Sequence, residues 1–254
     1  MVDPLLSVGA VKLPSMNSAP LTGYPIVLVP GFWLGGWAWE GVADRLRAAG
    51  HTVQAVTLPG LESAITDRSK ITIEDHVEAI RATVESMGQS VVLAVHSGAG
   101  VPGYAVTDRV PDRIATMVYV DSGPAIGALD PGFEGEEQLS PRIDDLDQNL
   151  DGLSEQQLLE FVRRALPEPG GAIREGVELR NPERLGVPSL MICCAFSAAQ
   201  LQAALDEGAG WLAGLKELRD VRWIDLPTSH WPMWSEPEKL AEILSDASHG
   251  MYAK

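Results

Sequence analysis

The 254-residue sequence has few cysteines, few basic residues and no long apolar run, and each shortage excludes a class of protein. Its two cysteines, Cys193 and Cys194, are adjacent in an apolar stretch. Neighbours in a strand point to opposite faces, so a disulfide between them is not expected. Lys and Arg number 19 against 35 Asp and Glu, a net charge of −16, which disfavours nucleic acid and anionic membrane surfaces as partners. The stretch 25–39 is too short and too glycine-rich to span a bilayer.

The first 24 residues lack the basic start and apolar block of a secretory signal, and they contain several prolines. We predict an irregular N-terminal arm over 1–24, followed by one domain over 25–254. About 45% of the residues are apolar, which is enough to build a sizeable core. Without a signal pattern or a disulfide, the expected location is the cytoplasm.

From residue 25 onward, short apolar runs alternate with helix-like stretches, which is typical of a parallel sheet with helical crossovers. Helices are predicted over 36–49 and 72–87. The second follows a capping-box sequence at Thr72–Asp75, and a last helix follows another such box at Ser235–Glu238. The fold class is therefore α/β, with a mostly parallel, doubly wound sheet. Its predicted strands cover 25–29, 52–57, 90–95, 114–120, 189–196 and 221–226.

The alternation stops between about 130 and 188, where no buried-strand pattern is present. Residues 130–184 hold 14 acidic and 6 basic residues, together with leucines at roughly helical spacing. This composition predicts a solvated helical insertion. A helical insertion can also serve as a lid that covers a pocket, and in that interpretation Leu158 and Phe161 face the substrate.

A serine lies where the predicted strand 90–95 passes into the next helix. A nucleophilic serine at such a turn needs small neighbours, because strand and helix then approach closely. Ser97 has them, although Val95 and Ala99 occupy the glycine positions of the Gly-x-Ser-x-Gly pattern. The Gly98 amide at the helix N-terminus is a candidate donor to an oxyanion.

Two loops offer the other parts of an acyl-transfer site. The glycine-rich loop 31–37 follows the first strand, and its Phe32 amide is the natural second oxyanion donor. His230 lies between the last strand and the last helix, where a general base can reach the serine. His96 directly precedes Ser97 and is expected to point away from it.

The order of serine, insertion and late histidine resembles the α/β-hydrolase superfamily over about 25–245. The loop 31–37 and the apolar residues after His230 are most similar to the methylesterase and hydroxynitrile lyase group and its bacterial esterase relatives. Pro30 departs from the histidine usual in that group. The resemblance implies an α/β-hydrolase fold with a helical lid. It also implies a serine hydrolase that cleaves a small, largely apolar carboxylic ester through an acyl-enzyme, without a cofactor.

The acid that would orient His230 is not where the family usually has it. An aspartate is expected shortly after the strand 189–195, but residues 196–201 contain no carboxylate. Some superfamily members carry the acid at the end of the neighbouring strand, where this sequence has Asp121. We predict Asp121 as the third member of the triad. A Ser97–His230 dyad and a polar relay through Ser197 are the alternatives.

The aromatic and sulfur side chains around the two loops, Trp33, Trp231, Met233 and Trp234, are predicted to wall the pocket or to belong to the core. The histidines and carboxylates show no metal-ligand spacing, so no metal is expected. A lyase, a C–C hydrolase, a cofactor-free dioxygenase and a silent ligand-binding member are the alternative functions. The absence of lysine from 130–188 disfavours the lyase. The partner is a small-molecule substrate, and the sequence does not indicate an oligomeric state.

Overall fold

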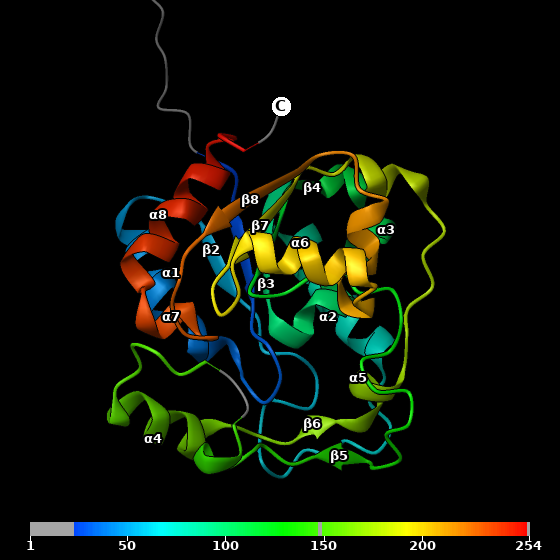
Figure 1. Ribbon diagram of the computed structural model, residues 1–254, viewed down its shortest axis with the longest axis vertical. Helices are drawn as coiled ribbons and strands as arrows, with labels where there is room; N and C mark the ends of the chain where they lie inside the picture. The colour runs from blue at the N-terminus through cyan, green and yellow to red at the C-terminus, as the bar shows by residue number, and fades with distance from the viewer. Residues whose placement is uncertain (1–22, 147–148, 253–254) are drawn as a thin grey trace, which may run out of the picture.

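The computed structural model describes residues 23–146 and 149–252. Most of the predicted N-terminal arm, residues 1–22, lies outside the described part of the chain. Figure 1 shows a central sheet with helices packed on both of its sides. The α/β prediction is confirmed.

Six parallel strands form the sheet, in the order β2-β1-β3-β4-β7-β8. They are β1 (Ile26–Val29), β2 (Val53–Ala55), β3 (Val91–His96), β4 (Ile114–Val120), β7 (Ser189–Cys193) and β8 (Val221–Asp225). Every residue of β1, β3 and β7 is buried, as their continuous apolar sequences require in a sheet covered on both faces. Because the strands are parallel, the loops after β1, β3, β4 and β8 all open at one edge of the sheet.

Successive side chains of each strand enter two different cores. Val27 and Val29 belong to a cluster with α2 (Ile73–Ser86), α3 (Gly100–Arg109) and α6 (Ala198–Glu207). Ile26 and Leu28 belong to a second cluster with α1 (Glu40–Ala48) and α8 (Pro237–Ser248). The two-residue period of a strand therefore produces the doubly wound arrangement. Three 3-10 segments connect these elements: η1 (Gly36–Trp39), η2 (Ser97–Ala99) and η3 (Pro111–Arg113).

The predicted boundaries hold in most places and fail in one. The capping box at Thr72 is present, because its hydroxyl accepts from the Asp75 amide and the Asp75 carboxylate accepts from the Thr72 amide. The capping box predicted at Ser235–Glu238 does not form. Helix α8 begins at Pro237 with Glu236 as N-cap and no side-chain capping bond. Ser235 instead ends the short helix α7 (Pro232–Ser235), where its hydroxyl meets that of Thr228 at 2.7 Å.

The insertion between β4 and β7 contains short elements rather than one helical layer. Figure 1 shows α4, β5 and β6 together at the end of the molecule opposite the C-terminus. A capping box of Ser154 and Gln157 begins α4, which buries Phe161. The elements are β5 (Glu137–Gln138), η4 (Ile143–Asp145), α4 (Glu155–Arg164), β6 (Glu168–Pro169), α5 (Gly170–Arg174) and η5 (Pro182–Gly186). After β7, η6 (Gly210–Lys216) follows α6.

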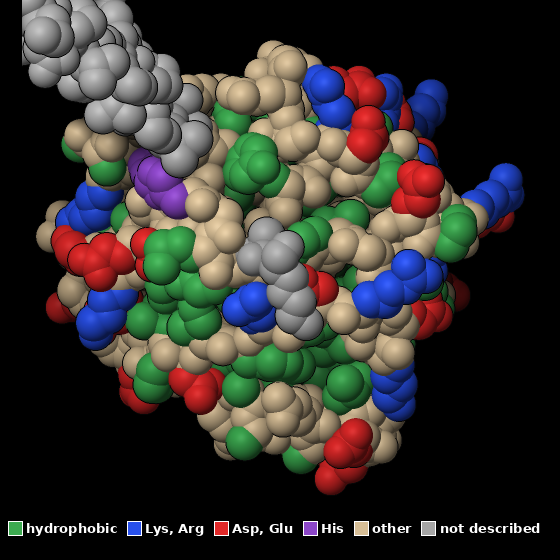
Figure 2. All heavy atoms as spheres, turned by 90° about the horizontal axis from the view of Figure 1, so that it is seen from above, with side chains coloured by type: hydrophobic (Ala, Val, Ile, Leu, Met, Phe, Trp, Pro, Cys, Tyr) green, Lys and Arg blue, Asp and Glu red, His purple; other side chains and the backbone are tan. Residues whose placement is uncertain are grey.

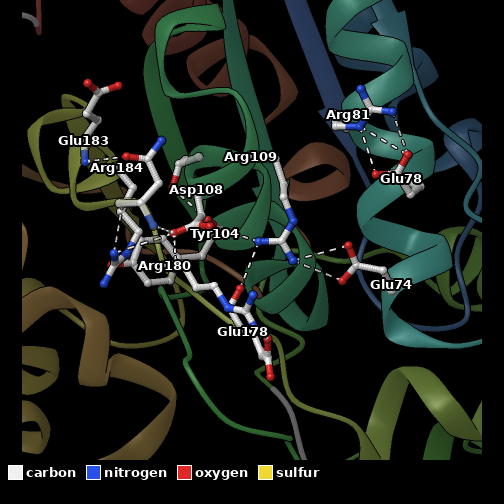
Figure 3. Close-up of polar contacts among 12 residues, drawn as sticks. Glu74, Glu78, Arg81, Tyr104, Asp108, Arg109, Glu178, Arg180, Glu183 and Arg184 are labelled. Atoms are coloured by element: carbon white, nitrogen blue, oxygen red, sulfur yellow. Dashed lines mark hydrogen bonds and ion pairs between the residues drawn. The ribbon is translucent and has the colours of Figure 1, made fainter.

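A charged network ties the end of the insertion to helix α3 (Figure 3). Buried Asp108 accepts from the backbone amides of Arg180 and Asn181 at 2.8 and 2.7 Å. Its carboxylate also lies 3.0 Å from the Arg109 guanidinium. An anion buried at this depth needs such partners. The network holds the chain that returns to β7 against the helix that follows Ser97.

Charges of both signs are mixed on one face of the molecule. On the face seen in Figure 2, the basic and acidic side chains of the described residues alternate around the edge, with hydrophobic side chains between them. No helix in ranges 23–146 and 149–252 is long and apolar enough to cross a membrane.

Candidate active site

Ser97 sits at a strained turn between β3 and α3. Its φ of 49° is in the left-handed region that non-glycine residues seldom adopt. The turn is possible because glycines line it: a Cβ on Gly31 would lie 2.7 Å from the Ser97 Cβ, and a Cβ on Gly100 would lie 2.3 Å from the Gly123 carbonyl oxygen. Helix α3 therefore approaches the loop after β4 at Gly100, and it approaches β3 at Gly103, where a Cβ would lie 2.5 Å from Val95 Cγ1.

Ser97, His230 and Asp121 form one hydrogen-bonded chain. The Ser97 hydroxyl lies 2.9 Å from His230 Nε2, and His230 Nδ1 lies 2.6 Å from Asp121 Oδ2. The side chains of His230 and Asp121 are only 13% and 6% exposed. With Nδ1–H donated to the carboxylate, Nε2 is left as the acceptor for the serine proton. This is the arrangement that a general base needs.

Asp121 is fixed by the strand on its other side. Its Oδ1 accepts from the amides of Cys194 and Ala195 at 3.0 Å each, and its own amide donates to the Ile192 carbonyl at 2.9 Å. Ser197 caps helix α6 through the Gln200 amide and does not contact His230. The carboxylate thus comes from β4, while the end of β7 supplies backbone donors to it.

Phe32 and Gly98, the two predicted oxyanion donors, line the same cavity as Ser97. The Phe32 N–H donates no hydrogen bond to another described residue, and the Gly98 N–H is in the first turn of η2, where amides lack partners within the helix. The Phe32 ring packs on Gly98 so closely that a Cβ there would lie 2.5 Å from a ring carbon. A side chain at residue 98 would therefore displace the Phe32 ring.

His96 lies beside His230, although the sequence predicted that it would point away from the site. Its Nε2 donates to the His230 carbonyl oxygen at 2.7 Å, and the two rings lie 4.8 Å apart. Burial, and then the nearby His230, hold the pKa of His96 well below its ordinary value. A neutral His96 therefore supports the backbone of the loop that carries His230.

A cavity of about 400 Å³ opens above Ser97. It is lined by the predicted pocket residues Trp33 and Trp231, together with Phe32 and Gly98. Leu158, Phe161 and Met233 do not, so their placement in the substrate pocket is wrong. Phe161 and Met233 are buried behind the wall, where the Phe161 ring packs on Trp231 at 5.5 Å.

No described residue of 130–188 is among the side chains that line the cavity. Its outer wall comes instead from Leu129, just before the insertion, and from Phe196, Leu201 and Trp211 after β7. Leu129, Phe196 and Trp211 are 39%, 52% and 38% exposed at the mouth. The position of these residues in the sequence could have indicated their role, because residues 196–211 follow the end of a strand at the edge of the sheet where the site opens.

A buried carboxyl that no sequence pattern indicated lies beside the site. Glu168 of β6 is 1% exposed, and its Oε2 accepts from the Trp33 amide at 2.9 Å. Burial raises its pKa from 4.5 to about 8, against the weaker opposing effects of the Trp33 amide and of Arg68. Within the described residues, no group of three His, Cys, Asp or Glu side chains is arranged to hold a metal ion.

Glu168→Gln is expected to flatten the dependence of thermal stability on pH. Between pH 4.5 and about 8 the folded protein keeps a proton on Glu168 that the unfolded chain releases. Wild-type stability therefore falls as pH rises through this window, by on the order of a few kcal/mol. The variant has no proton to release, so its melting temperature should rise relative to wild type from pH 5 to pH 8, as measured by calorimetry.

The comparison isolates residue 168. Arg68, His76 and the Arg68 partner Glu137 face this region in both proteins. Their contributions to the pH dependence of stability therefore cancel when the two proteins are compared. Glu207→Gln on the exposed face of α6 is the control. If wild type and Glu168→Gln show parallel curves, the buried carboxyl is not protonated in the folded state.

Comparison with known proteins shows the family of this fold. A model of the Alpha/beta hydrolase family matches residues 26–243. The carbendazim hydrolyzing esterase of Nocardioides sp. (strain SG-4G) is 35% identical over 98 residues, which are 38% of this chain and 40% of that protein. Methylesterase 8 of Arabidopsis thaliana is 36% identical over 123 residues, 46% of this chain and 43% of that protein. The matched stretches thus span less than half the length of these relatives.

The likeness of the folds extends further than the sequence matches. An extracellular alpha/beta-hydrolase from a Paenibacillus species superposes with a TM-score of 0.71 at 22% identity, covering 89% of this chain and 98% of that one. At that identity the comparison shows a shared fold. Since the family model also covers most of the sequence, this chain belongs to the α/β-hydrolase family.

Proposed function

We propose that this protein is a serine esterase that cleaves a small, neutral, largely apolar carboxylic ester through an acyl-enzyme. The observation that carries the proposal is the continuous hydrogen-bonded chain Ser97–His230–Asp121 at the base of the cavity. A serine, a base that accepts its proton and a carboxylate that orients the base are the parts that acyl transfer needs.

The lining of the cavity supports a neutral, apolar substrate. Its wall is mainly aromatic and aliphatic, and the described lining residues include no Lys or Arg. A substrate with its own carboxylate would meet no cation there, and the net charge of −16 would repel it. The partly matching relatives whose names include esterase or methylesterase support the ester as the reacting group.

The acylation step follows from the geometry. Ser97 Oγ attacks the ester carbonyl carbon while His230 Nε2 takes the hydroxyl proton, and Asp121 stabilises the imidazolium through Nδ1–H. The carbonyl oxygen gains negative charge and accepts from the Phe32 and Gly98 amides. The imidazolium then protonates the leaving alkoxide oxygen, the C–O bond breaks, and the alcohol departs from an acyl-Ser97.

Deacylation repeats the sequence with water. His230 takes a proton from the water, the hydroxide adds to the acyl carbon, and the same two amides stabilise the second oxyanion. Collapse breaks the bond to Ser97 Oγ, which receives the proton back from His230. The products are a carboxylic acid and an alcohol.

Labelling with a fluorophosphonate tests the proposal. We expect one adduct per chain, mapped by peptide mass spectrometry to Ser97, because a phosphonate forms the tetrahedral centre that the two amides stabilise. An adduct on another serine, or none at a pH where short-chain esters are hydrolysed, would overturn the proposal.

Trp211→Ala is expected to change substrate preference more than chemistry. Trp211 walls the mouth of the cavity, so its removal withdraws apolar contact from a bulky acyl or alcohol group but not from acetate or methanol. Loss of such contacts is worth roughly 10- to 200-fold in discrimination. We expect kcat/KM to fall by about tenfold or more for an aromatic ester and to change little for a short one.

Leu159→Ala is the matched control, since this exposed residue of α4 lies outside the cavity. It should leave the ratio of the two kcat/KM values unchanged. Equal losses on both esters in Trp211→Ala would mean that Trp211 supports the site without selecting the substrate.

A further inference from the structure

The backbone of Trp33 is held in an unusual conformation beside the proposed oxyanion site. Its φ of 66° is left-handed, which a bulky side chain disfavours. Such a conformation persists only where the surroundings over-determine it. Trp33 directly follows Phe32, whose amide is one of the two oxyanion donors, so the direction of that amide depends on how the Trp33 peptide is fixed.

The insertion supplies both bonds that fix Trp33. Glu168 Oε2 accepts from the Trp33 N–H at 2.9 Å, and the Leu166 N–H donates to the Trp33 carbonyl oxygen at 2.9 Å. These two residues are more than 130 positions away in the sequence. Neither lines the cavity, so their contact is with the loop and not with the substrate.

The segment that carries Glu168 is itself firmly held. Arg68, only 4% exposed, donates to the Pro167 carbonyl oxygen at 2.9 Å and to the Ser63 carbonyl oxygen at 2.8 Å. Pro169 packs on Gly60 so closely that a Cβ there would lie 2.5 Å from its Cγ. A side chain anchored in this way can impose its geometry on a neighbouring loop.

We propose that Glu168 is a positioning residue of the oxyanion hole: by holding the left-handed Trp33 peptide, it aims the Phe32 amide at the developing oxyanion. This inference rests on the proposed function, since it assumes that Phe32 donates in the transition state. It also gives the insertion a role other than covering the pocket. The insertion sets the oxyanion loop from behind, while α6 and η6 provide the substrate wall.

Two variants, Glu168→Leu and Glu168→Gln, separate the hydrogen bond that positions Trp33 from the space that the Glu168 side chain fills. Leucine fills similar space without an acceptor, whereas the glutamine side-chain oxygen can still accept from the Trp33 amide. On a short-chain ester, we expect Glu168→Leu to lower kcat at least tenfold with little change in KM, because an oxyanion donor acts on the transition state. The affinity for a trifluoromethyl ketone should fall by the same factor, and Glu168→Gln should recover most of both.

Glu175→Leu is the matched control. Glu175 belongs to the same insertion and also accepts from a backbone amide, that of Ile73 at 3.2 Å, but this bond is away from the cavity. Its loss should lower the melting temperature and leave kcat unchanged. A role in stability alone would give the same pattern for Glu168→Leu, and that result would overturn the proposal. So would a glutamine variant as impaired as the leucine variant.

The wild-type protein offers a test that needs no variant. The Trp33 amide should exchange slowly with deuterium, as measured by NMR, because it is bonded to a buried carboxyl. Exchange at the rate of an unprotected amide would contradict the proposal. Failure of wild type to hydrolyse esters or to react with a fluorophosphonate would instead contradict the proposed function, so the two failures are distinguishable.

Discussion

Replacing Ser97 with alanine is expected to lower kcat for ester hydrolysis by on the order of 10⁵- to 10⁶-fold, by analogy with the nucleophile of a serine protease. Its hydroxyl is 2.9 Å from His230 Nε2 and is the nucleophile of the proposed acyl-enzyme. Without it no covalent intermediate forms, and only the oxyanion amides and substrate binding contribute to the residual rate. The measurement is kcat on a chromogenic ester, together with fluorophosphonate labelling, which should disappear.

Ser197→Ala is the control for this variant. Ser197 caps α6 and has no contact with His230, so its loss should lower stability by about 1 kcal/mol without lowering kcat. The Ser97→Ala variant should keep its fold, since alanine removes one oxygen only. Activity within tenfold of wild type in purified Ser97→Ala would mean that another group forms the bond to the substrate.

Asp121→Asn is expected to reduce kcat by a factor on the order of 10⁴ while preserving the fold, again by analogy with a serine protease triad. The carboxylate accepts from His230 Nδ1 at 2.6 Å and from two backbone amides at 3.0 Å. An asparagine can keep the amide bonds only by turning its NH₂ toward Nδ1. The imidazole then carries its proton on Nε2, where it cannot accept from Ser97.

The pH dependence of the rate supplies a second readout. The imidazolium formed during attack loses its neighbouring negative charge in Asp121→Asn, so the residual activity should respond to strong external bases, such as hydroxide, more than wild type does. Asp225→Asn is a control, because Asp225 accepts from the Ala198 amide outside the cavity. A loss of less than tenfold in Asp121→Asn would favour the Ser97–His230 dyad.

The order of the elements was largely predictable from the sequence. Strands buried on both faces have continuous apolar sequences such as those of β3 and β4, and this pattern depends only on local composition. The Thr72 capping box is equally local, and it is present. The similar sequence at Ser235 fails, because tertiary contacts with Thr228 and Ser229 engage the hydroxyl that would have capped α8.

By itself the sequence determined the fold class, the place of Ser97 at a strand end and the loop that carries His230, because parallel strands bring their carboxyl ends to one edge. Only the tertiary structure decided the rest. Asp121 meets His230 through the pairing of β4 with β7. Leu158 and Phe161 do not line the cavity, and the Phe161 ring of α4 packs on Trp231. Glu168 reaches Trp33 across 135 positions. Such contacts depend on how the insertion folds back on the sheet, and no local pattern in the chain encodes that path.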